Sequence, residues 1–463
     1  MTNLTITFAE RIFDIQSTTL SDADLEQLHV LIFDLIGVAY GGAQRPWVAA
    51  MHHWAHPYAG TGKSSVCASE MRVPPTIAAL INGTAAHSFE LDDTHDASLS
   101  HPGAVVIPAA IAVAETIGAG GAEFLAAIVA GYETMARLGM AANIANVIGH
   151  GHHPTAILGV FGAATAASIL YKLDFATSLQ AWGHALSLSA GSMQFSDEPF
   201  GTTVKRLHAG YPAHNGILAA EMARAGVSAP QQAIDGRYGF LHLFGRDVRP
   251  ETLLETPPRL AIHDISLKPY ACCRQFHAVI DGLDSVTKGR ASSSIRRIVV
   301  RGPSILYEQH MIRRPESPMA AQYSLPFVIG ATLEFGATRF DVFEQDYLNH
   351  EGILRWGDII TVEHDSSLEA EFPAHLGAEV EVTFDGGSIG KKRVLDSLGT
   401  RRSPLSWQYL TTKISALTRG APRSFEVDRA QRMIQGLPDA GTAAFHSVLS
   451  GRCRQPERVS HEA

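Results

Sequence analysis

The 463-residue sequence contains little cysteine and no apolar run long enough to cross a membrane. Its four cysteines are too few and too scattered for a disulfide framework, and the adjacent Cys272 and Cys273 lack the C-x-x-C spacing of a zinc or redox site. The lightly charged apolar stretch 156–171 falls short of the about 20 residues that a spanning helix needs. No basic segment followed by an apolar stretch marks a secretory signal. We therefore expect reduced thiols, a cytoplasmic location and no membrane partner.

Concentrated positive charge and nucleotide-binding motifs are also missing. The formal net charge is -9 and no Lys/Arg-rich run occurs, which argues against nucleic acid as a partner. Neither a G-x-x-x-x-G-K-[ST] loop nor a strand-borne G-x-G-x-x-G is present, so we predict no nucleotide cofactor. No G-x-S-x-G nucleophile elbow occurs. The cluster His52-His53-x-x-His56 has no nearby acid, so we predict no metal site either.

What the sequence does contain is a long series of helical segments. Its length favours two domains, because it exceeds one ordinary core. Ser21 is a suitable N-cap for a helix over 20–40, in which leucine and isoleucine recur at helical spacing. Further helices, mostly rich in alanine and glycine, are predicted at 76–89, 104–117, 122–137, 155–170 and 176–189. These segments predict an all-helical domain over 1–265.

The pattern changes near 260–265. Alternation typical of strands occurs at 296–301, 359–364 and 378–384, with helical segments at 276–288 and 325–335 between them. We predict a smaller α+β domain over 266–402. The segment 403–463 contains two more helices, at 405–417 and 427–437, which are expected to return to the first domain. The predicted fold class is therefore mainly α with a smaller α+β domain.

Two polar clusters adjoin predicted helices in the first domain. The segment 90–103 places four acids and two histidines between two helices, a position in which functional groups are often held. The alternative for this segment is a solvated loop whose Asp or Ser caps the next helix. The sequence His153-Pro154-Thr155 places a histidine and a hydroxyl at a helix N-terminus, where backbone N–H groups favour anions. For the neighbouring His150 and His152 a surface turn is the better interpretation.

The other two clusters carry the positive charge. Lys205 and Arg206, in the segment 200–210, adjoin a predicted small-residue helix over 213–223. The small neighbours imply burial, and a buried lysine requires a carboxylate, although a Lys-Arg pair is more often a solvated face. The fourth cluster, 268–277, falls at the predicted domain junction, where ligand pockets are common. Its alternative interpretation is an ordinary polar linker.

Taken in order, these clusters resemble the MmgE/PrpD family, which includes 2-methylcitrate dehydratase, cis-aconitate decarboxylase and iminodisuccinate epimerase. The resemblance covers nearly the whole chain. The segments that carry it are Glu90-Leu-Asp-Asp-Thr, His101-Pro-Gly, Gly131-Tyr-Glu, His153-Pro-Thr with Gly159 and Gly162, Lys205 with Gly210, Lys268-Pro-Tyr-x-Cys-Cys-Arg-x-x-His277, Ala321-Gln-Tyr-Ser-Leu-Pro, and Ser403-Pro-Leu-Ser before Lys413.

The resemblance implies a large helical domain made from both chain ends, a smaller α+β lid, a homodimer and no cofactor. It also implies a site between the domains. The positions that match the family's site residues are Glu90, Thr94, His101, His153, Lys205 and Lys268, and His277 belongs to the same motif.

This sequence departs from the related decarboxylases at two places. They carry Asp where Glu90 stands, and they place a histidine near the position of Cys273, which argues against decarboxylation here. The loop between Thr94 and His101 varies in length across the family, so the match is least secure there.

These residues suit chemistry at a proton next to a carboxylate, where an enzyme must stabilise the carbanion and supply a base. We assign carbanion stabilisation to Lys205 and Lys268, and the acid–base steps to His101 and His153, because histidine titrates near neutrality. Thr94 would orient a substrate group. The remaining candidates are Glu90, which would fix a histidine tautomer or a lysine charge, and the substrate-binding residues Asp93, Arg206, Arg274 and His277.

The expected substrate is a small di- or tricarboxylic acid. Our leading hypothesis is a hydro-lyase similar to 2-methylcitrate dehydratase. An epimerase of the iminodisuccinate type comes second, and a decarboxylase of the cis-aconitate type third. The alternative from another class is a catalytically silent binding protein that keeps the pocket.

Overall fold

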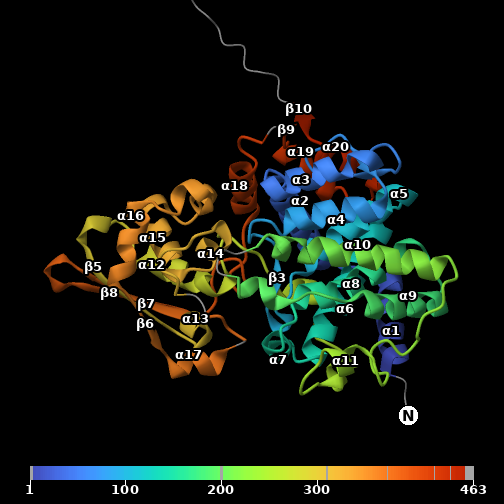
Figure 1. Ribbon diagram of the computed structural model, residues 1–463, viewed down its shortest axis with the longest axis horizontal. Helices are drawn as coiled ribbons and strands as arrows, with labels where there is room; N and C mark the ends of the chain where they lie inside the picture. The colour runs from blue at the N-terminus through green and yellow to red at the C-terminus, as the bar shows by residue number, and fades with distance from the viewer. Residues whose placement is uncertain are drawn as a thin grey trace, which may run out of the picture.

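The computed structural model describes residues 4–198, 202–308, 311–372, 374–421, 423–437 and 439–453. Two hydrophobic cores divide these residues into a large helical part and a smaller part that contains a four-stranded sheet (Figure 1). The predicted fold class, mainly α with a smaller α+β portion, is confirmed. Among the described residues, no helix is both long and apolar enough to cross a bilayer.

The helical part is built around α8, of which every residue is buried. This helix packs against α5, α6, α9 and α10, and α10 also packs on α4. The approach of α10 to α4 requires Gly210, since a Cβ there would lie 2.3 Å from the Leu80 carbonyl oxygen. The helices of this part are α1 (Leu4–Asp14), α2 (Asp22–Gly42), α3 (Pro46–Ala55), α4 (Pro75–Ala86), α5 (Pro102–Ile117), α6 (Gly121–Ala141), α7 (Ile144–Gly149), α8 (Pro154–Leu170), α9 (Phe175–Leu188), α10 (Val204–Arg224) and α11 (Phe240–Leu243).

The smaller part contains a sheet with the strand order β6-β5-β7-β8. Its strands are β5 (Ile295–Gly302), β6 (Ile360–His364), β7 (Ala378–Phe384) and β8 (Ile389–Val394), and only the β5–β6 pairing is parallel. Ile298 and Val380 are fully buried where α12 packs on β7 and β8. On β5, Arg301 pairs with Glu363 at 2.9 Å. The helices here are α12 (His277–Thr287), α13 (Ile305–Glu308), α14 (Pro318–Gln322), α15 (Leu325–Phe335), α16 (Glu351–Leu354) and α17 (Ser366–Glu371).

The C-terminal segment returns to the helical part, as expected. Helices α18 (Trp407–Leu417) and α19 (Val427–Gln435) both contact α2, and Figure 1 shows them beside α2 and α3. A buried ion pair of 2.7 Å between Lys413 and Asp34 joins α18 to α2. The last elements are α20 (Phe445–Leu449), β9 (Arg423–Ser424) and β10 (Arg452–Cys453). Residues 454–463 of the predicted segment 403–463 lie outside the described residues.

The structure corrects several sequence-based expectations. Helix α10 begins at Val204 rather than near 213, because packing on α4 and α8 overrides Gly210 and Pro212. Three strands precede residue 260, β1 (Ser64–Ser65), β2 (Arg72–Val73) and β3 (Thr94–His95), but each has only two residues, too few to show alternation. Strand β3 pairs with β4 (Ile265–Ser266), which ties the segment 90–103 to the domain junction.

Candidate active site

The core of the candidate site is the carboxylate of Glu90, which lies in the loop after α4. Its backbone has a φ of +54°, a left-handed conformation that is uncommon for glutamate. One carboxylate oxygen accepts hydrogen bonds from Lys205 and Arg206 at the start of α10. The other accepts from Lys268 at 3.4 Å and from the Tyr323 hydroxyl at 3.1 Å. Three buried cations therefore converge on one carboxylate.

The pKa values of these groups show which charges the cluster stabilises. Burial tends to raise the pKa of Glu90, but Lys205, Lys268 and Arg206 together hold it well below its usual range. Burial lowers the pKa of Lys205 to about 8, although Glu90 opposes the change. For Lys268 burial also acts downward, yet Glu90 and Asp92 raise its pKa. The carboxylate is thus firmly ionised, and Lys205 is the cation that its surroundings stabilise least.

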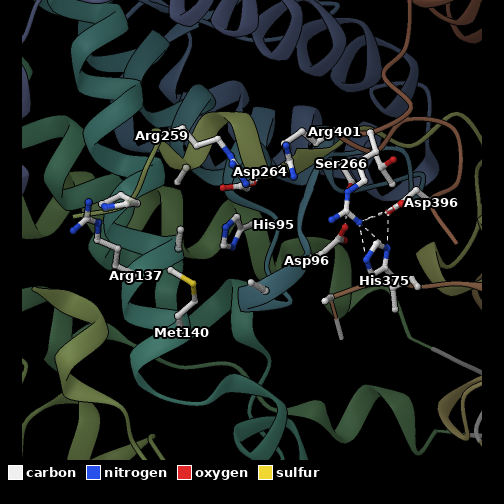
Figure 2. Close-up of a pocket in the computed structure, with 18 of the residues that line it drawn as sticks. His95, Asp96, Arg137, Met140, Arg259, Asp264, Ser266, His375, Asp396 and Arg401 are labelled. Carbon is white, nitrogen blue, oxygen red and sulfur yellow. Dashed lines mark hydrogen bonds and ion pairs between the residues drawn. The ribbon is translucent and has the colours of Figure 1, made fainter. Parts of the chain in front are cut away.

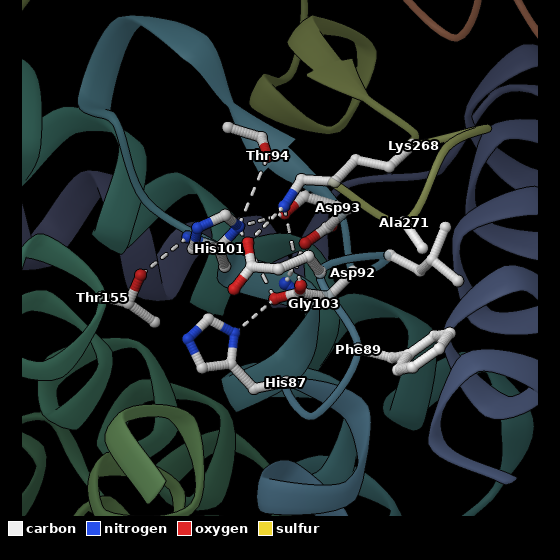
Figure 3. A network of polar contacts seen from close by, with 12 residues as sticks. His87, Phe89, Asp92, Asp93, Thr94, His101, Gly103, Thr155, Lys268 and Ala271 are labelled. Carbon is white, nitrogen blue, oxygen red and sulfur yellow. Dashed lines mark hydrogen bonds and ion pairs between the residues drawn. The ribbon is translucent and has the colours of Figure 1, made fainter. Parts of the chain in front are cut away.

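His101 occupies the N-cap of α5, beside this cluster (Figure 3). Its Nδ1 lies 2.7 Å from the backbone oxygen of Asp93 and 3.3 Å from the Thr94 hydroxyl. Its backbone N–H donates to the Thr155 hydroxyl, at the first turn of α8, over 3.1 Å. Burial lowers the pKa of His101 to about 3, so the ring is neutral near pH 7. With Nδ1–H donated to a carbonyl, Nε2 is left as the basic nitrogen.

His153 occupies the N-cap of α8, and its backbone N–H donates to the Gly191 oxygen over 2.9 Å. Its ring is buried, and burial holds its pKa well below the usual value. Within the described residues, its Nδ1 has no hydrogen-bond partner. Its ring centroid lies 5.0 Å from that of His208 and 6.0 Å from that of His87. The two predicted histidines therefore both lie near His87, since the His101 ring centroid is 5.1 Å from that of His87.

His87 and Asp92 are site residues that the sequence analysis missed. His87 Nδ1 lies 2.6 Å from Asp92 Oδ2, and the same carboxylate oxygen is 3.5 Å from His101 Nδ1. Asp92 also lies 3.8 Å from the Lys268 ammonium. The sequence predicted a helix over 76–89 with His87 in its interior, whereas α4 ends at Ala86 and His87 caps it. A histidine followed five residues later by an aspartate at a helix end was the available signal.

Both carboxylate oxygens of Asp93 accept hydrogen bonds from other residues of the chain. The Gly103 N–H donates to Oδ1 over 2.9 Å and the Tyr132 hydroxyl donates to Oδ2 over 2.7 Å. Burial, together with the charge of Asp92, raises the pKa of Asp93 to about 7. The arrangement does not support the predicted substrate contact of Asp93. Its carboxylate instead supports the first turn of α5, which carries His101.

Two further predicted residues lie apart from the Glu90 cluster. Arg274 is among the residues that line a pocket of about 360 Å³ at the domain junction. Figure 2 shows this pocket with Asp96, Ser266 and Asp396 among its labelled residues. The Arg274 guanidinium donates to Ser397 over 2.9 Å and lies 3.6 Å from Asp96. His277 is fully buried beside Tyr270 in the core of the smaller part. Neither side chain has a described contact with Glu90, Lys205 or Lys268, so their role in substrate binding stays a prediction.

The fold and this buried cluster of cations and histidines define an enzyme of small-molecule metabolism. Two family models match the chain, the MmgE/PrpD N-terminal domain over residues 7–253 and the MmgE/PrpD C-terminal domain over residues 270–439. The chain belongs to the MmgE/PrpD family, which confirms the resemblance seen in the sequence.

Curated relatives match over most of their length. The chain is 28% identical to human cis-aconitate decarboxylase, and the match covers 99% of this chain and 97% of that protein. It is 28% identical to a cis-aconitate decarboxylase-like protein of Aspergillus oryzae, with 83% and 84% covered. It is 25% identical to cis-aconitate decarboxylase of Aspergillus terreus, with 89% of each chain covered.

Proposed function

We propose that this protein makes or breaks a C–H bond next to a carboxylate in a small di- or tricarboxylic acid. The observation that carries the proposal is the convergence of Lys205, Arg206 and Lys268 on the single carboxylate of Glu90. Asp92 is a second ionised acid, 3.8 Å from the Lys268 ammonium, so the three buried cations exceed the two internal carboxylates by one positive charge. A substrate with several carboxylates would supply the missing negative charge.

The cations suit the electronic demand of the reaction. When the C–H bond breaks, its electron pair spreads into the adjacent carboxylate, and the resulting enediolate carries an additional negative charge. Lys205 and Lys268 are buried, so their interaction with that charge is screened little by water. Arg206 is held by Glu90 and by the Gln322 side chain at 2.8 Å, which makes it a fixed part of the same cluster.

The histidines suit the proton transfers. His101 and His153 are both neutral near pH 7 because burial lowers their pKa values. A neutral imidazole accepts a proton, and the imidazolium that results donates it elsewhere. Thr94, 3.3 Å from His101, is placed to orient a substrate hydroxyl or carboxylate.

Among the reactions open to such a site we propose dehydration, as catalysed by a hydro-lyase similar to 2-methylcitrate dehydratase. Loss of a β-hydroxyl requires a base for the α-proton and an acid for the departing oxygen, and a neutral imidazole that has taken the α-proton becomes the imidazolium that can protonate that oxygen. The resemblance adds that Glu90 and Cys273 differ from the residues of related decarboxylases. Cys273 is buried beside Lys268, and burial raises its pKa to about 11.

Decarboxylation of an acid of the cis-aconitate type is the second candidate. The names of the relatives favour it, since those described above are cis-aconitate decarboxylases or similar to one. The chemistry differs only in the bond that supplies the electron pair. Loss of CO₂ leaves that pair on carbon, and a proton donor of the site must then protonate it.

The deciding experiment is incubation of the purified protein with 2-methylcitrate, citrate, cis-aconitate and iminodisuccinate in D₂O, followed by NMR. A new alkene with loss of the hydroxyl is the expected result. Release of CO₂ from cis-aconitate would indicate a decarboxylase instead of a hydro-lyase. Deuterium entering the α-position without a new alkene would indicate an epimerase. Binding without any turnover would favour the catalytically silent binding protein and contradict the proposal.

We also propose a homodimer located in the cytoplasm, as the family resemblance implies. No cofactor is proposed. Light scattering coupled to size-exclusion chromatography tests the dimer, for which a mass near twice 49.8 kDa is expected. A mass near 49.8 kDa at micromolar concentration would contradict it.

A further inference from the structure

The histidine that the sequence analysis missed has the geometry of a base held by a carboxylate. His87 Nδ1 lies 2.6 Å from Asp92 Oδ2, and both side chains are fully buried. Burial tends to raise the pKa of Asp92. The opposing effect of His87, His101 and Lys268 is larger and lowers this pKa, so Asp92 is ionised. An ionised carboxylate only accepts hydrogen bonds, so His87 Nδ1 carries the proton and donates it to Asp92. The lone pair of the neutral ring is therefore on Nε2.

That second nitrogen is the unusual feature. Within the described residues, His87 Nε2 is buried and has no hydrogen-bond partner. A buried polar atom without a partner destabilises the folded protein. Such an atom in a native protein requires an explanation, and a catalytic role is one of the recognised ones. Figure 3 shows this nitrogen on the side of the ring opposite Asp92.

The surroundings of His87 are those of the proposed site. Its ring centroid lies 5.1 Å from that of His101 and 6.0 Å from that of His153. Glu90 and Lys205 are close enough for their charges to act on its pKa, which burial lowers. His87 comes from the end of α4, His101 from the start of α5 and His153 from the start of α8. Three helix ends thus bring the imidazoles of His101 and His153 within 5.1 Å and 6.0 Å of the His87 ring, close to the cations.

We propose that His87, oriented by Asp92, is a third acid–base residue of this site. The proposal rests on the proposed function and extends it. In the forward step the substrate C–H bond breaks, the proton forms an N–H bond with His87 Nε2, and the electron pair remains on the substrate as an enediolate. Asp92 stabilises the imidazolium that forms. In the return step the Nε2 proton goes to carbon or to the departing hydroxyl, which leaves as water.

The principal test is the variant His87→Asn. Its amide N–H replaces Nδ1–H toward Asp92, while the basic nitrogen is lost. We expect kcat to fall by about 100-fold, with KM changed less than about threefold, because general acid–base catalysis of this kind is worth about 100-fold or more. The rate of deuterium exchange at the α-carbon should fall by the same factor.

The matched control is His29→Asn, since His29 is also buried but lies in α2 and bonds to the Leu437 backbone oxygen. We expect this variant to lower the melting temperature and to change kcat less than about twofold. If His87→Asn lowers kcat no more than His29→Asn does, the proposal is wrong. The same holds if His87→Asn raises KM and leaves kcat unchanged, because His87 would then contribute only to binding.

A second measurement does not depend on turnover or on a folded variant. Tricarballylate, a tricarboxylate without a hydroxyl group, is added to the wild-type protein while the histidine side chains are followed by NMR. We expect the pKa of His87 to rise by about one unit or more, because the bound anion stabilises the imidazolium. An unchanged His87 pKa at saturating tricarballylate overturns the inference. Turnover of all four acids could fail while His87 responds, in which case only the proposed reaction is wrong.

Discussion

Two neighbouring buried ion clusters in this protein differ in the number of cations that contact each carboxylate. Lys413 and Asp34 form a one-to-one pair, with the Lys413 ammonium 2.7 Å and 3.1 Å from the two carboxylate oxygens. Around Glu90, three cations share one carboxylate. The clusters are neighbours, since Lys413 also donates to the backbone oxygen of Leu91 at 3.4 Å. The first joins two helices, whereas the second has more positive charge than Glu90 and the nearby Asp92 together can balance.

The pKa values record the same difference. In the one-to-one pair, burial raises the pKa of Asp34 and lowers that of Lys413, so each group moves toward its neutral form. In the three-to-one cluster, the pKa of Glu90 is lowered despite burial. The pKa of Lys205 is lowered instead, so this lysine is the group that moves toward its neutral form. A balanced buried pair serves stability or specificity. An unbalanced one in a family of enzymes points to a bound anion, and the comparison can be tested.

The largest effect is expected from Lys268→Met, which removes one of the excess cations. Turnover should fall by about 1,000-fold, because the enediolate loses a buried cation that it contacts in the transition state. The melting temperature should change little, since Lys205 and Arg206 still neutralise Glu90. Steady-state kinetics and calorimetry measure the two quantities. A large drop in stability with little loss of turnover would make Lys268 the equivalent of Lys413.

The comparison also shows what the sequence could predict. The helices at 104–117 and 155–170 were predicted within two residues of α5 and α8, because long apolar segments with proline at the N-terminus leave few alternatives. Lys205 was predicted from its small neighbours and Lys268 from its place at the domain junction, and the resemblance implies that both are site positions. The requirement of a carboxylate for buried Lys205 was correctly anticipated, and Glu90 supplies it.

Other features depend on contacts between distant segments. His87 was hidden because the end of α4 was placed three residues too late, at 89 rather than 86. Asp93 accepts a hydrogen bond from Tyr132, which lies 39 residues away in α6. No local sequence pattern reveals this contact. Arg274 was assigned to the substrate because it lies in the same motif as Lys268. The chain turns between them, and Arg274 contacts Ser397 and Asp96 instead.

The next effect is expected from Lys413→Met, which breaks the balanced pair. Asp34 would be left buried without a partner, so the free energy of unfolding should fall by about 3–5 kcal/mol, as measured by urea denaturation at pH 7. The double variant Asp34→Leu with Lys413→Met should recover most of this loss, because it removes both charges. A single variant as stable as the wild type would show that the pair contributes nothing to joining α18 and α2.

A smaller effect is expected from raising the pH, which removes the positive charge of Lys205. The pKa of Lys205 is lowered to about 8, so the ammonium is present below pH 8 and is lost as the pH rises above it. We expect kcat/KM to fall about tenfold between pH 8.5 and pH 9.5, since one group deprotonates over that range. Lys268 cannot produce this decline, because its pKa is raised.

Lys205→Arg separates this explanation from others, because a guanidinium stays charged throughout the range. The variant should be less active at pH 7 and should show no decline up to pH 10. An identical alkaline decline in Lys205→Arg would assign the titration to a different group.

The smallest effect is expected from Glu90→Gln, which keeps the three cations and removes the internal carboxylate. Tricarballylate should bind about threefold more tightly than to the wild type, because it no longer shares the cations with Glu90. Isothermal titration calorimetry measures the affinity, and Asp34→Asn is the matched control, since it neutralises the acid of the balanced pair. Equal gains in both variants would mean that any lost negative charge improves binding. Weaker binding in Glu90→Gln alone would mean that Glu90 holds the lysines in their charged, binding-competent form.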